Sequence, residues 1–562
     1  MSKLTERQQD IVKCEDNVFV TACPGSGKTR VLTFKVMREL ERLESSKKRI
    51  IALTFTNRSA EEIKSRLQDN DVPTRQLWAG TIHAFALDWI LRPYSCYIDC
   101  LRHGFSVVDE LYSRMLIDTL KDKYNIKRFT EVRARFDRNG QLTNSDRTHC
   151  ALLKEYYEQL ADARLTDFDQ ILSLSVQLLK DLPSVAKTLG AIVEWIFIDE
   201  YQDTQDLQYA ILSAVCRASS RRTRIFIVGD DSQAIYASRG GDSKTREEIQ
   251  AEFGVNVLIH FFLEENFRST QRIVDYCGEF QEPETPISSR AEHANERGLI
   301  SFSNQDVFVD ALPRYIKTII QQHLDAGVPP EEICVLAPRW QFVTELGRRL
   351  VSELPDVELD APGLSPFRRQ QDNLWFKLAR IFLTDPEPQR FRKRVLWASE
   401  FLMQLEQELG SELHVNLRSP RRVLKMCNES ASLSENGVQY LQESIKTYLE
   451  KLGLSLLEYP SLQESMDSFF DTSVERLNDP DYQFPTDTAY LRRLYRHPNG
   501  VVLNTCQGAK GEEYDVVIVF GVLRGYVPHW HRIFDDAVDD ADDARKIPDR
   551  HGLWGIEKGR AI

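Results

Sequence analysis

The chain has 562 residues, a length that exceeds what one hydrophobic core usually serves. Of these residues 42% are hydrophobic and 28% are charged, a composition that argues against bulk disorder. No run reaches the roughly 18 consecutive apolar residues of a membrane span, and the start MSKLTERQQD lacks a signal-peptide core, so we expect a cytoplasmic protein. A net charge of -13 argues against a nucleic-acid protein built on global basicity but is compatible with a local basic groove.

In chain order, the first part of the sequence repeats one pattern, a short apolar run followed by a polar turn and an amphipathic segment. Four runs have this form: DNVFVTA at 16–22, IIALTFT at 50–56, WIFIDEYQD at 195–203 and RIFIVGDDSQAIY at 224–236. Short apolar runs between helices are typical of strands buried on both faces of a parallel sheet. Between residues 90 and 190 helical patterns replace the strands, which predicts a helical insertion.

The same organisation returns in the second half. Its apolar runs are VNVLIHFFL at 255–263, EEICVLAP at 331–338 and VVLNTCQGAKGEEYDVVIVFG at 501–521, and residues 370–495 are mostly helical in pattern. We therefore expect an α/β protein with two cores, each interrupted by a helical subdomain. The expected boundaries are a first core at 1–90 and 166–255 around an insertion at 91–165, and a second core at 256–370 and 499–562 around an insertion at 371–498.

The segment ACPGSGKT at 22–29 has the form of a Walker A loop, with Ala22 where the first glycine is usual. Glycines let backbone N–H groups surround a phosphate, Lys28 adds a positive charge, and the hydroxyl of Thr29 reaches Mg²⁺. A glycine-rich turn before a helix is the structural alternative, but the position between an apolar run and an amphipathic helix favours nucleotide binding. The expected ATP-binding residues here are Pro24, Gly25, Ser26, Gly27, Lys28, Thr29 and Arg30.

Two acidic residues, Asp199 and Glu200, follow the apolar run WIFI. They lie where a strand ends, which is the edge at which α/β sheets place ligands. Adjacent acids are commonplace, but downstream of a Walker A loop they predict a Walker B pair. Asp199 would then lie beside Mg²⁺ and Glu200 would polarise the attacking water, which makes Glu200 and Lys28 catalytic candidates.

Further segments, in the same order along the chain, resemble the motifs of UvrD/Rep/PcrA-like DNA helicases of superfamily 1. They are LTERQQ at 4–9, TFTNRSAEEI at 54–63 (motif Ia), GTIHAF at 80–85 (motif Ib), LTDFDQIL at 165–172, VGDDSQAIYASRGGD at 228–242 (motif III), LEENFRST at 263–270 (motif IV) and NTCQGAKGEEYDVVIV at 504–519 (motif V). The resemblance implies two RecA-like parallel-sheet P-loop domains, each with a mostly helical insertion. It also implies an ATP-driven and Mg²⁺-dependent motor that moves 3′ to 5′ on single-stranded DNA or at junctions with duplex.

The resemblance implies roles around the nucleotide. Gln8 would read adenine, with Gln9 as the less favoured alternative, and Phe267 would stack on the base. Glu513 would face the ribose. Two further catalytic candidates are Gln233, as the sensor of the γ-phosphate, and Arg268, which would reach that phosphate across a cleft from the second core.

A second set of residues is expected, by the same resemblance, to face nucleic acid. Phe55 would stack on a base, although a phenylalanine at a strand end is commonly a core residue. The expected DNA-binding residues are Thr54, Phe55, Asn57, His83, Tyr236, Arg239, Thr505 and Gln507.

The sequence departs from the family at two points. Ser238 occupies the place of an aromatic residue in motif III, and ADDARKIPDRHGLWGIEKGRAI stands in place of a motif VI with its second γ-phosphate arginine. Because Arg545, Arg550 and Arg560 are weak substitutes, we expect slow ATP hydrolysis.

A second hypothesis follows, a nucleotide- and DNA-sensing subunit of a nuclease complex with weak or no unwinding. The compact chain resembles the UvrD-like subunits of Gabija-type anti-phage systems, which accompany an OLD-family nuclease. DNA repair is the other biological setting that the resemblance implies.

Overall fold

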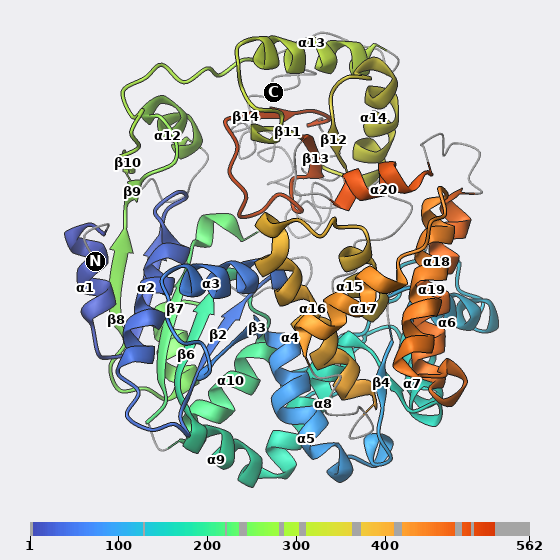
Figure 1. Ribbon diagram of the computed structural model, residues 1–562. Coiled ribbons are helices and arrows are strands. Elements are labelled where there is room, and N and C mark those ends of the chain that lie inside the picture. The colour runs from blue at the N-terminus through green and yellow to red at the C-terminus, as the bar shows by residue number, and fades with distance from the viewer. Residues whose placement is uncertain are drawn as a thin grey trace. The chain divides into compact units, whose positions relative to one another are not determined.

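The computed structural model describes residues 4–108, 110–127, 130–219, 222–234, 244–279, 286–302, 311–361, 373–409, 419–477, 486–495 and 500–522. The chain divides into two compact units, Met1–Ile300 and Ser301–Ile562 (Figure 1). Within the described residues, no helix combines the length and the apolar character needed to cross a membrane.

The first unit is built on a six-stranded sheet in the order β3-β2-β6-β7-β1-β8, and every neighbouring pair in it is parallel. The strands are β1 (Val18–Ala22), β2 (Arg49–Thr54), β3 (Leu77–Thr81), β6 (Val193–Asp199), β7 (Arg224–Gly229) and β8 (Ile259–Leu263). Parallel strands bring their carboxyl ends to one edge, so the loops after β1, β6 and β7 leave the sheet on the same side.

Helices cover both faces of this sheet (Figure 1). Alternate strand residues point to opposite faces. Val18 and Val20 pack with α1 (Glu6–Lys13), α2 (Lys28–Glu41) and α3 (Asn57–Asp69), whereas Phe19 and Ile51 pack against the other set of helices. That set comprises α8 (Phe168–Asp181), α9 (Pro183–Ile192), α10 (Asp206–Ala218) and α11 (Arg246–Phe253).

One strand belongs to a different sheet from the one the sequence suggested. The apolar run at 255–263, expected to open the second core, contains β8, which pairs with β1 from Val18↔Ile259 to Ala22↔Leu263. A period of apolar residues predicts a strand but not its partner, and here Leu263 completes the apolar cluster on the α2 face. The expected start of the second core at residue 256 is therefore wrong for this strand, and the other boundaries stay predictions.

The insertion between β3 and β6 has a small core of its own. Its strands β4 (Ser106–Val107) and β5 (Leu165–Thr166) pair in parallel, and α6 (Glu110–Lys123) and α7 (Arg147–Asp162) enclose a cluster around Leu152, Leu153 and Tyr156. The segments before it, α4 (Ile82–Phe85), the π-helix η1 (Ala86–Leu91) and α5 (Arg92–Tyr94), lead away from β3. They bring Phe85, Ile90 and Leu91 into the apolar cluster of the main sheet.

The second unit repeats the plan with a smaller sheet. Its four strands, all parallel to their neighbours, run in the order β12 (Leu359–Asp360), β13 (Val501–Thr505), β11 (Ile333–Ala337) and β14 (Val516–Val519), with α13 (Leu312–Asp325) and α14 (Trp340–Glu353) packed on them.

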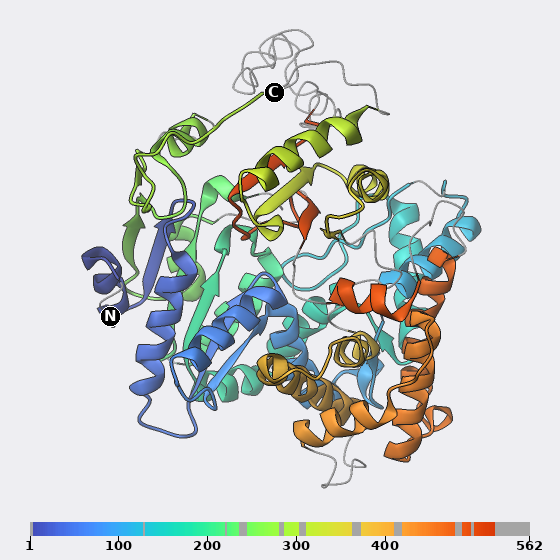
Figure 2. The same cartoon turned by 45° about the horizontal axis from the view of Figure 1, so that its top comes forward.

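A helical bundle, drawn in yellow-brown to orange-red in Figure 2, also belongs to this unit. It contains α15 (Leu374–Phe382), α16 (Phe391–Leu409), α17 (Pro420–Ser430), α18 (Gly437–Leu452), α19 (Pro460–Leu477) and α20 (Thr488–Tyr495) around a core with Trp375 and Tyr448. The predicted α/β class with two parallel sheets and helical insertions is confirmed.

Candidate functional site

The loop between β1 and α2 has the backbone of an anion-binding turn. Gly25 and Gly27 have φ of +68° and +79°, in the left-handed region that favours glycine, and α2 is a 14-residue helix that begins at Lys28. Ser26 donates from Oγ to the carbonyl of Cys23 over 2.7 Å, which holds the turn. Because the N–H groups at a helix start are unpaired and carry partial positive charge, this loop can bind phosphate.

Gly25 also has a second constraint, the close approach of Asn266. A Cβ on Gly25 would lie 2.6 Å from Asn266 Nδ2 and 2.9 Å from the Cβ of Arg268. Asn266 Nδ2 donates to the carbonyl of Pro24 and the amide of Phe267 donates to the carbonyl of Gly25, each over 2.8 Å. The segment after β8 is therefore hydrogen bonded directly to the phosphate loop.

The same side chain organises the residues that follow it. Asn266 is 5% exposed, and its Oδ1 accepts hydrogen bonds from the amides of Arg268 and Ser269, each over 2.8 Å. Sequence analysis missed Asn266, because an amide that bonds only to backbone carries no chemical signature. Its place in LEENFRST was the available signal.

Arg268 and Phe267 thus belong to the unit that carries the phosphate loop. The expectation that Arg268 comes from the second core is wrong, because only two residues separate the end of β8 at Leu263 from Asn266. Phe267 is 38% exposed, so its ring is available for contact with a ligand.

Gln8, not Gln9, contacts the phosphate loop. Gln8 Nε2 donates to the carbonyl of Ser26 over 3.1 Å, and its Oε1 accepts from the amide of Thr5 in a capping box at the start of α1. Gln9 Nε2 donates to the carbonyl of Leu4 instead. This arrangement supports the choice of Gln8, whose contact with adenine stays a prediction.

The acidic pair lies at the end of β6. Lys28 Nζ is 3.7 Å from Glu200 Oε2, and Gln202 Nε2 donates to the same oxygen over 2.6 Å. Glu200 has φ of +54°, a left-handed conformation that costs a residue other than glycine about 1–2 kcal/mol. The strained backbone and two contacts hold the Glu200 carboxylate beside the first lysine of α2.

Asp199 is a buried carboxyl group whose ionised form is disfavoured by its surroundings. Burial raises its pKa to about 7, the neighbouring charge of Glu200 raises it as well, and the ammonium of Lys28 opposes both. A cation at this point would favour the ionised carboxylate. The residues present therefore fit the Mg²⁺ that the fold implies, with Asp199 and Thr29 as the expected ligands.

The loop after β7 is tied to the acidic pair by Gln202. The amide of Asp230 donates to Gln202 Oε1 over 3.0 Å, and Gln233 Nε2 donates to Asp230 Oδ2 over 2.7 Å. A Cβ on Gly229 would lie 2.3 Å from Gln202 Oε1, so this approach requires glycine. Asp230, to which Gln233 is bonded, is within reach of the charge of Lys28, which opposes the rise that burial causes in the pKa of Asp230.

A cavity of about 210 Å³ joins the acidic pair to several expected DNA-binding residues. Thr54, Phe55 and His83 line it together with Asp199 and Glu200. Phe55 is 40% exposed, whereas Thr54 is buried and donates to the carbonyl of Thr56. The structure thus brings the candidate stacking residue to the edge of the hydrolysis site.

His83 has no charge to offer a phosphate. Burial lowers its pKa to about 4, so the ring is neutral at physiological pH. It packs edge-on against Phe168, with 6.0 Å between the ring centres.

The structure also describes three further residues that the sequence assigned to nucleotide or DNA. Asn57 is the first residue of α3, Arg30 is the third of α2, and Pro24 lies within the phosphate loop. The remaining candidates of motif III and of the C-terminal segment lie outside the described residues, namely Tyr236, Ser238, Arg239, Arg545, Arg550 and Arg560.

Three expected residues belong to the second unit, at or after the end of β13. Thr505 is buried, and its Oγ1 accepts from the amide of Gly508 over 3.0 Å, so it shapes the turn. Gln507 and Glu513 are exposed in and after that turn. The carboxyl end of β13, beside β11, is a position where parallel sheets bind ligands.

A glycine-rich turn from a parallel strand into a helix, with a lysine against a strand-end carboxylate pair, defines a P-loop nucleotide-binding protein of the RecA-like kind. Residues 4–254 match the UvrD/REP helicase N-terminal domain. Together with the relatives described below, this match makes the chain similar to the UvrD/PcrA-like helicases of superfamily 1.

The relatives extend the likeness along the chain. The ATP-dependent DNA helicase PcrA of Staphylococcus aureus (strain MRSA252) is 23% identical over 607 residues, which cover 97% of this chain and 80% of that protein. The PcrA of Staphylococcus epidermidis (strain ATCC 35984) is 23% identical over 602 residues with the same two shares. A solved structure of two coordinating Pif1 helicases on forked DNA is 12% identical, covers 61% of this chain and 56% of that one, and has a TM-score of 0.23, too low to support an argument.

Proposed function

We propose that this protein is an ATP-dependent translocase or helicase on single-stranded DNA, moving 3′ to 5′ in DNA repair or anti-phage defence. The observation that carries the proposal is the contact of Lys28 with Glu200, beside a cavity that Phe55 also lines. Hydrolysis chemistry and a candidate base-stacking residue share one small space. The similarity to the UvrD/REP helicase N-terminal domain and to PcrA helicases supports the same activity.

The chain's own residues provide the parts that phosphoryl transfer to water needs. The amides of residues 25–29 and the ammonium of Lys28 would bind the phosphates, and Glu200 would orient a water and accept its proton. Arg268, held against the phosphate loop by Asn266, would stabilise charge on the transferred phosphoryl group. Mg²⁺ bound by Thr29 and Asp199 would supply neutralising charge.

The link to DNA would pass through the cavity and through Gln202. A shift of Glu200 on hydrolysis changes a hydrogen bond of Gln202, and Gln202 also holds the amide of Asp230 where the motif III segment begins. Phe55, which lines the same cavity, would stack on a base.

The test separates binding from hydrolysis. Lys28→Ala should abolish ATP binding, whereas Glu200→Gln should bind ATP normally and lower kcat by about 10²–10⁴-fold, the usual contribution of a general base. Glu194→Gln is the matched control, because Glu194 lies on the same strand and also pairs with a lysine, Lys48, over 3.0 Å. Unchanged steady-state hydrolysis in Glu200→Gln would show that the base is wrongly assigned.

A second candidate function is a nucleotide- and DNA-sensing subunit of a nuclease complex. Ser238, where the family has an aromatic residue, favours it because one stacking platform is lost. Purified protein should then hydrolyse ATP slowly on single-stranded DNA and speed up when an OLD-family nuclease is added. Fast unwinding of a forked duplex by the chain alone would exclude this candidate.

A further inference from the structure

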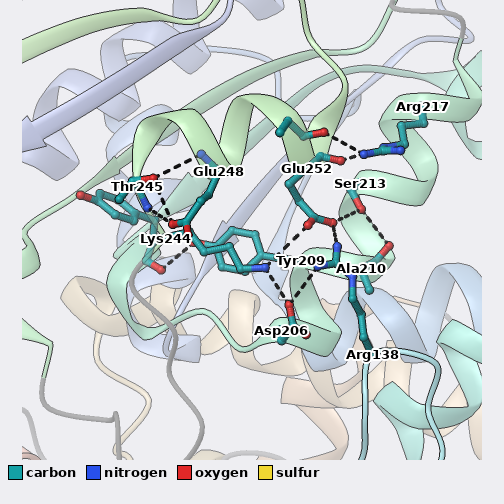
Figure 3. Close-up of polar contacts among 12 residues, drawn as sticks. Arg138, Asp206, Tyr209, Ala210, Ser213, Arg217, Lys244, Thr245, Glu248 and Glu252 are labelled. Carbon is teal, nitrogen blue, oxygen red and sulfur yellow. Dashed lines mark hydrogen bonds and ion pairs between the residues drawn. The ribbon is translucent and has the colours of Figure 1, made fainter.

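Four charged residues from three segments of the first unit meet in one place, and together they are called the polar cluster (Figure 3). Asp206 is the first residue of α10, Glu252 lies on α11, Lys244 lies two residues before α11, and Arg138 comes from the helical insertion. Lys244 Nζ is 2.7 Å from Asp206 Oδ1 and 3.6 Å from Glu252 Oε2. Arg138 contacts the same two carboxylates, with Nη1 3.4 Å from Asp206 Oδ1.

The polar cluster has two positive and two negative side chains and is half buried. The side chains of Lys244 and Glu252 are 9% and 7% exposed, whereas those of Arg138 and Asp206 are 46% and 45% exposed. Burial raises the pKa of Glu252, but hydrogen bonds from Arg138 and Ser213 and the positive charges outweigh it, so the carboxyl stays ionised. Removing one cation would leave a buried carboxylate with too little positive charge around it.

The helix that carries Asp206 is tied to the Walker B pair. α10 begins seven residues after Asp199, and Tyr209 Oη donates to the carbonyl of Tyr201 over 3.0 Å. Lys244 Nζ lies 4.7 Å from the centre of the Tyr209 ring. A displacement at Glu200 and Tyr201 is therefore transmitted directly to the start of α10.

Two described residues that flank the expected DNA contacts of motif III, Asp230 and Lys244, are attached to that same stretch of chain. Near the start of motif III, the amide of Asp230 donates to Gln202 Oε1 over 3.0 Å. Just after the end of motif III, Lys244 pairs with Asp206. The chain on each side of the expected DNA contacts is thus held by the residues that follow the acidic pair.

Arg138 adds the insertion to this linkage. Its loop is docked on α8, where Gln177 Nε2 donates to the carbonyl of Gly140 over 2.6 Å and Ser173 Oγ donates to the same oxygen over 3.0 Å. From that loop Arg138 reaches both α10 and α11.

We propose that the polar cluster is a positioning device that couples ATP hydrolysis to DNA, with Lys244 and Arg138 transmitting the position of α10 to α11, which follows motif III in the chain, and to the insertion. The proposal rests on the proposed function and deepens it. The contacts described for both residues are with α10 and α11, so both act through the segments that they hold.

The experiment measures ATP hydrolysis by the full chain with and without saturating single-stranded DNA. Lys244→Met and Arg138→Met should lower the stimulation by DNA about tenfold, the usual size of coupling between two sites, and leave basal kcat and the KM for ATP within about twofold. Both methionines fit, because the cluster borders an open cavity of about 890 Å³. Lys244→Arg keeps the charge and should restore the stimulation.

Arg217→Met is the matched control. Arg217 lies on α10 and also contacts α11, but it donates to the backbone carbonyls of Glu252 and Ala251, each over 2.8 Å. It should lose stability, measured by thermal unfolding, without losing stimulation. Equal loss in Arg217→Met, or full stimulation in both cluster variants, would overturn the proposal alone. A wild-type protein that hydrolyses ATP but ignores DNA would overturn the proposed function and this coupling together.

Discussion

Replacing Asn266 by alanine tests whether the phosphate loop depends on its clamp. The change removes three hydrogen bonds, from the amides of Arg268 and Ser269 and to the carbonyl of Pro24, each 2.8 Å long. At about 1 kcal/mol each, their loss amounts to about 3 kcal/mol if no water replaces them. Arg268 is exposed and Ser269 is half buried, so water can replace some of the hydrogen bonds to their amides. We therefore expect a net loss of about 2 kcal/mol.

This net loss should appear in catalysis, because Arg268 loses its fixed place beside Gly25. A loss of about 2 kcal/mol in transition-state stabilisation corresponds to roughly a 30-fold lower kcat/KM for ATP. Steady-state ATPase assays with single-stranded DNA measure it. The effect should fall mainly on kcat, since ground-state phosphate binding still has Lys28 and the loop amides.

Asn17→Ala provides the control on the same sheet. Asn17 Oδ1 accepts from the amide of Ile225 and its Nδ2 donates to the carbonyl of Val257, each over 3.0 Å, at the opposite end of the strands. Its loss should lower the unfolding temperature and leave kcat/KM unchanged. If Asn266→Ala behaved like Asn17→Ala, with lower stability and normal kinetics, the clamp would have no part in catalysis.

Three further changes have simple readouts. Phe55→Ala should weaken single-stranded DNA binding by about 1–3 kcal/mol without altering its salt dependence, because it removes stacking and no charge; a shallower slope in anisotropy titrations would contradict this. His83→Gln should also leave the salt slope at pH 7 unchanged, since burial holds the pKa of His83 at about 4. Burial raises the pKa of Asp167 to about 6, so the folded protein favours the protonated carboxyl. The stability that this carboxyl contributes is therefore fully present below about pH 4 and is lost as the pH rises through 6. Asp167→Asn should therefore stabilise the fold by about 1–3 kcal/mol at pH 8 and by less at pH 5 in urea unfolding, and the reverse order would refute the sign.

Local chemistry was readable from the sequence wherever one short segment carries it. Glycines before Lys28 predict a phosphate loop, and acids after an apolar run predict a Walker B pair, because a few neighbouring residues encode the required backbone and charge. The two parallel sheets followed from the same alternation of apolar runs and helices. The assignment of Gln8 over Gln9 also agrees with the contact to Ser26.

Features that depend on tertiary pairing were not readable. The run at 255–263 predicts a strand, but its partner is fixed by packing of Leu263 on the α2 face. Gln202 and Asn266 act by hydrogen bonding to backbone that only the fold brings near. Arg138 and Glu252 are 114 residues apart in sequence, so no local pattern announces their pairing.

The register of β8 against β1 sets the position of Arg268, the candidate catalytic arginine, relative to the phosphate loop. Ala22, the last residue of β1, is level with Leu263, and Asn266 follows three residues later. A slip of one residue would move the following segment by about 3.3 Å and turn its side chains to the other face. A residue inserted between Leu263 and Asn266 should therefore be far more damaging than one inserted in the exposed turn at 45–47, although neither alters a single catalytic side chain.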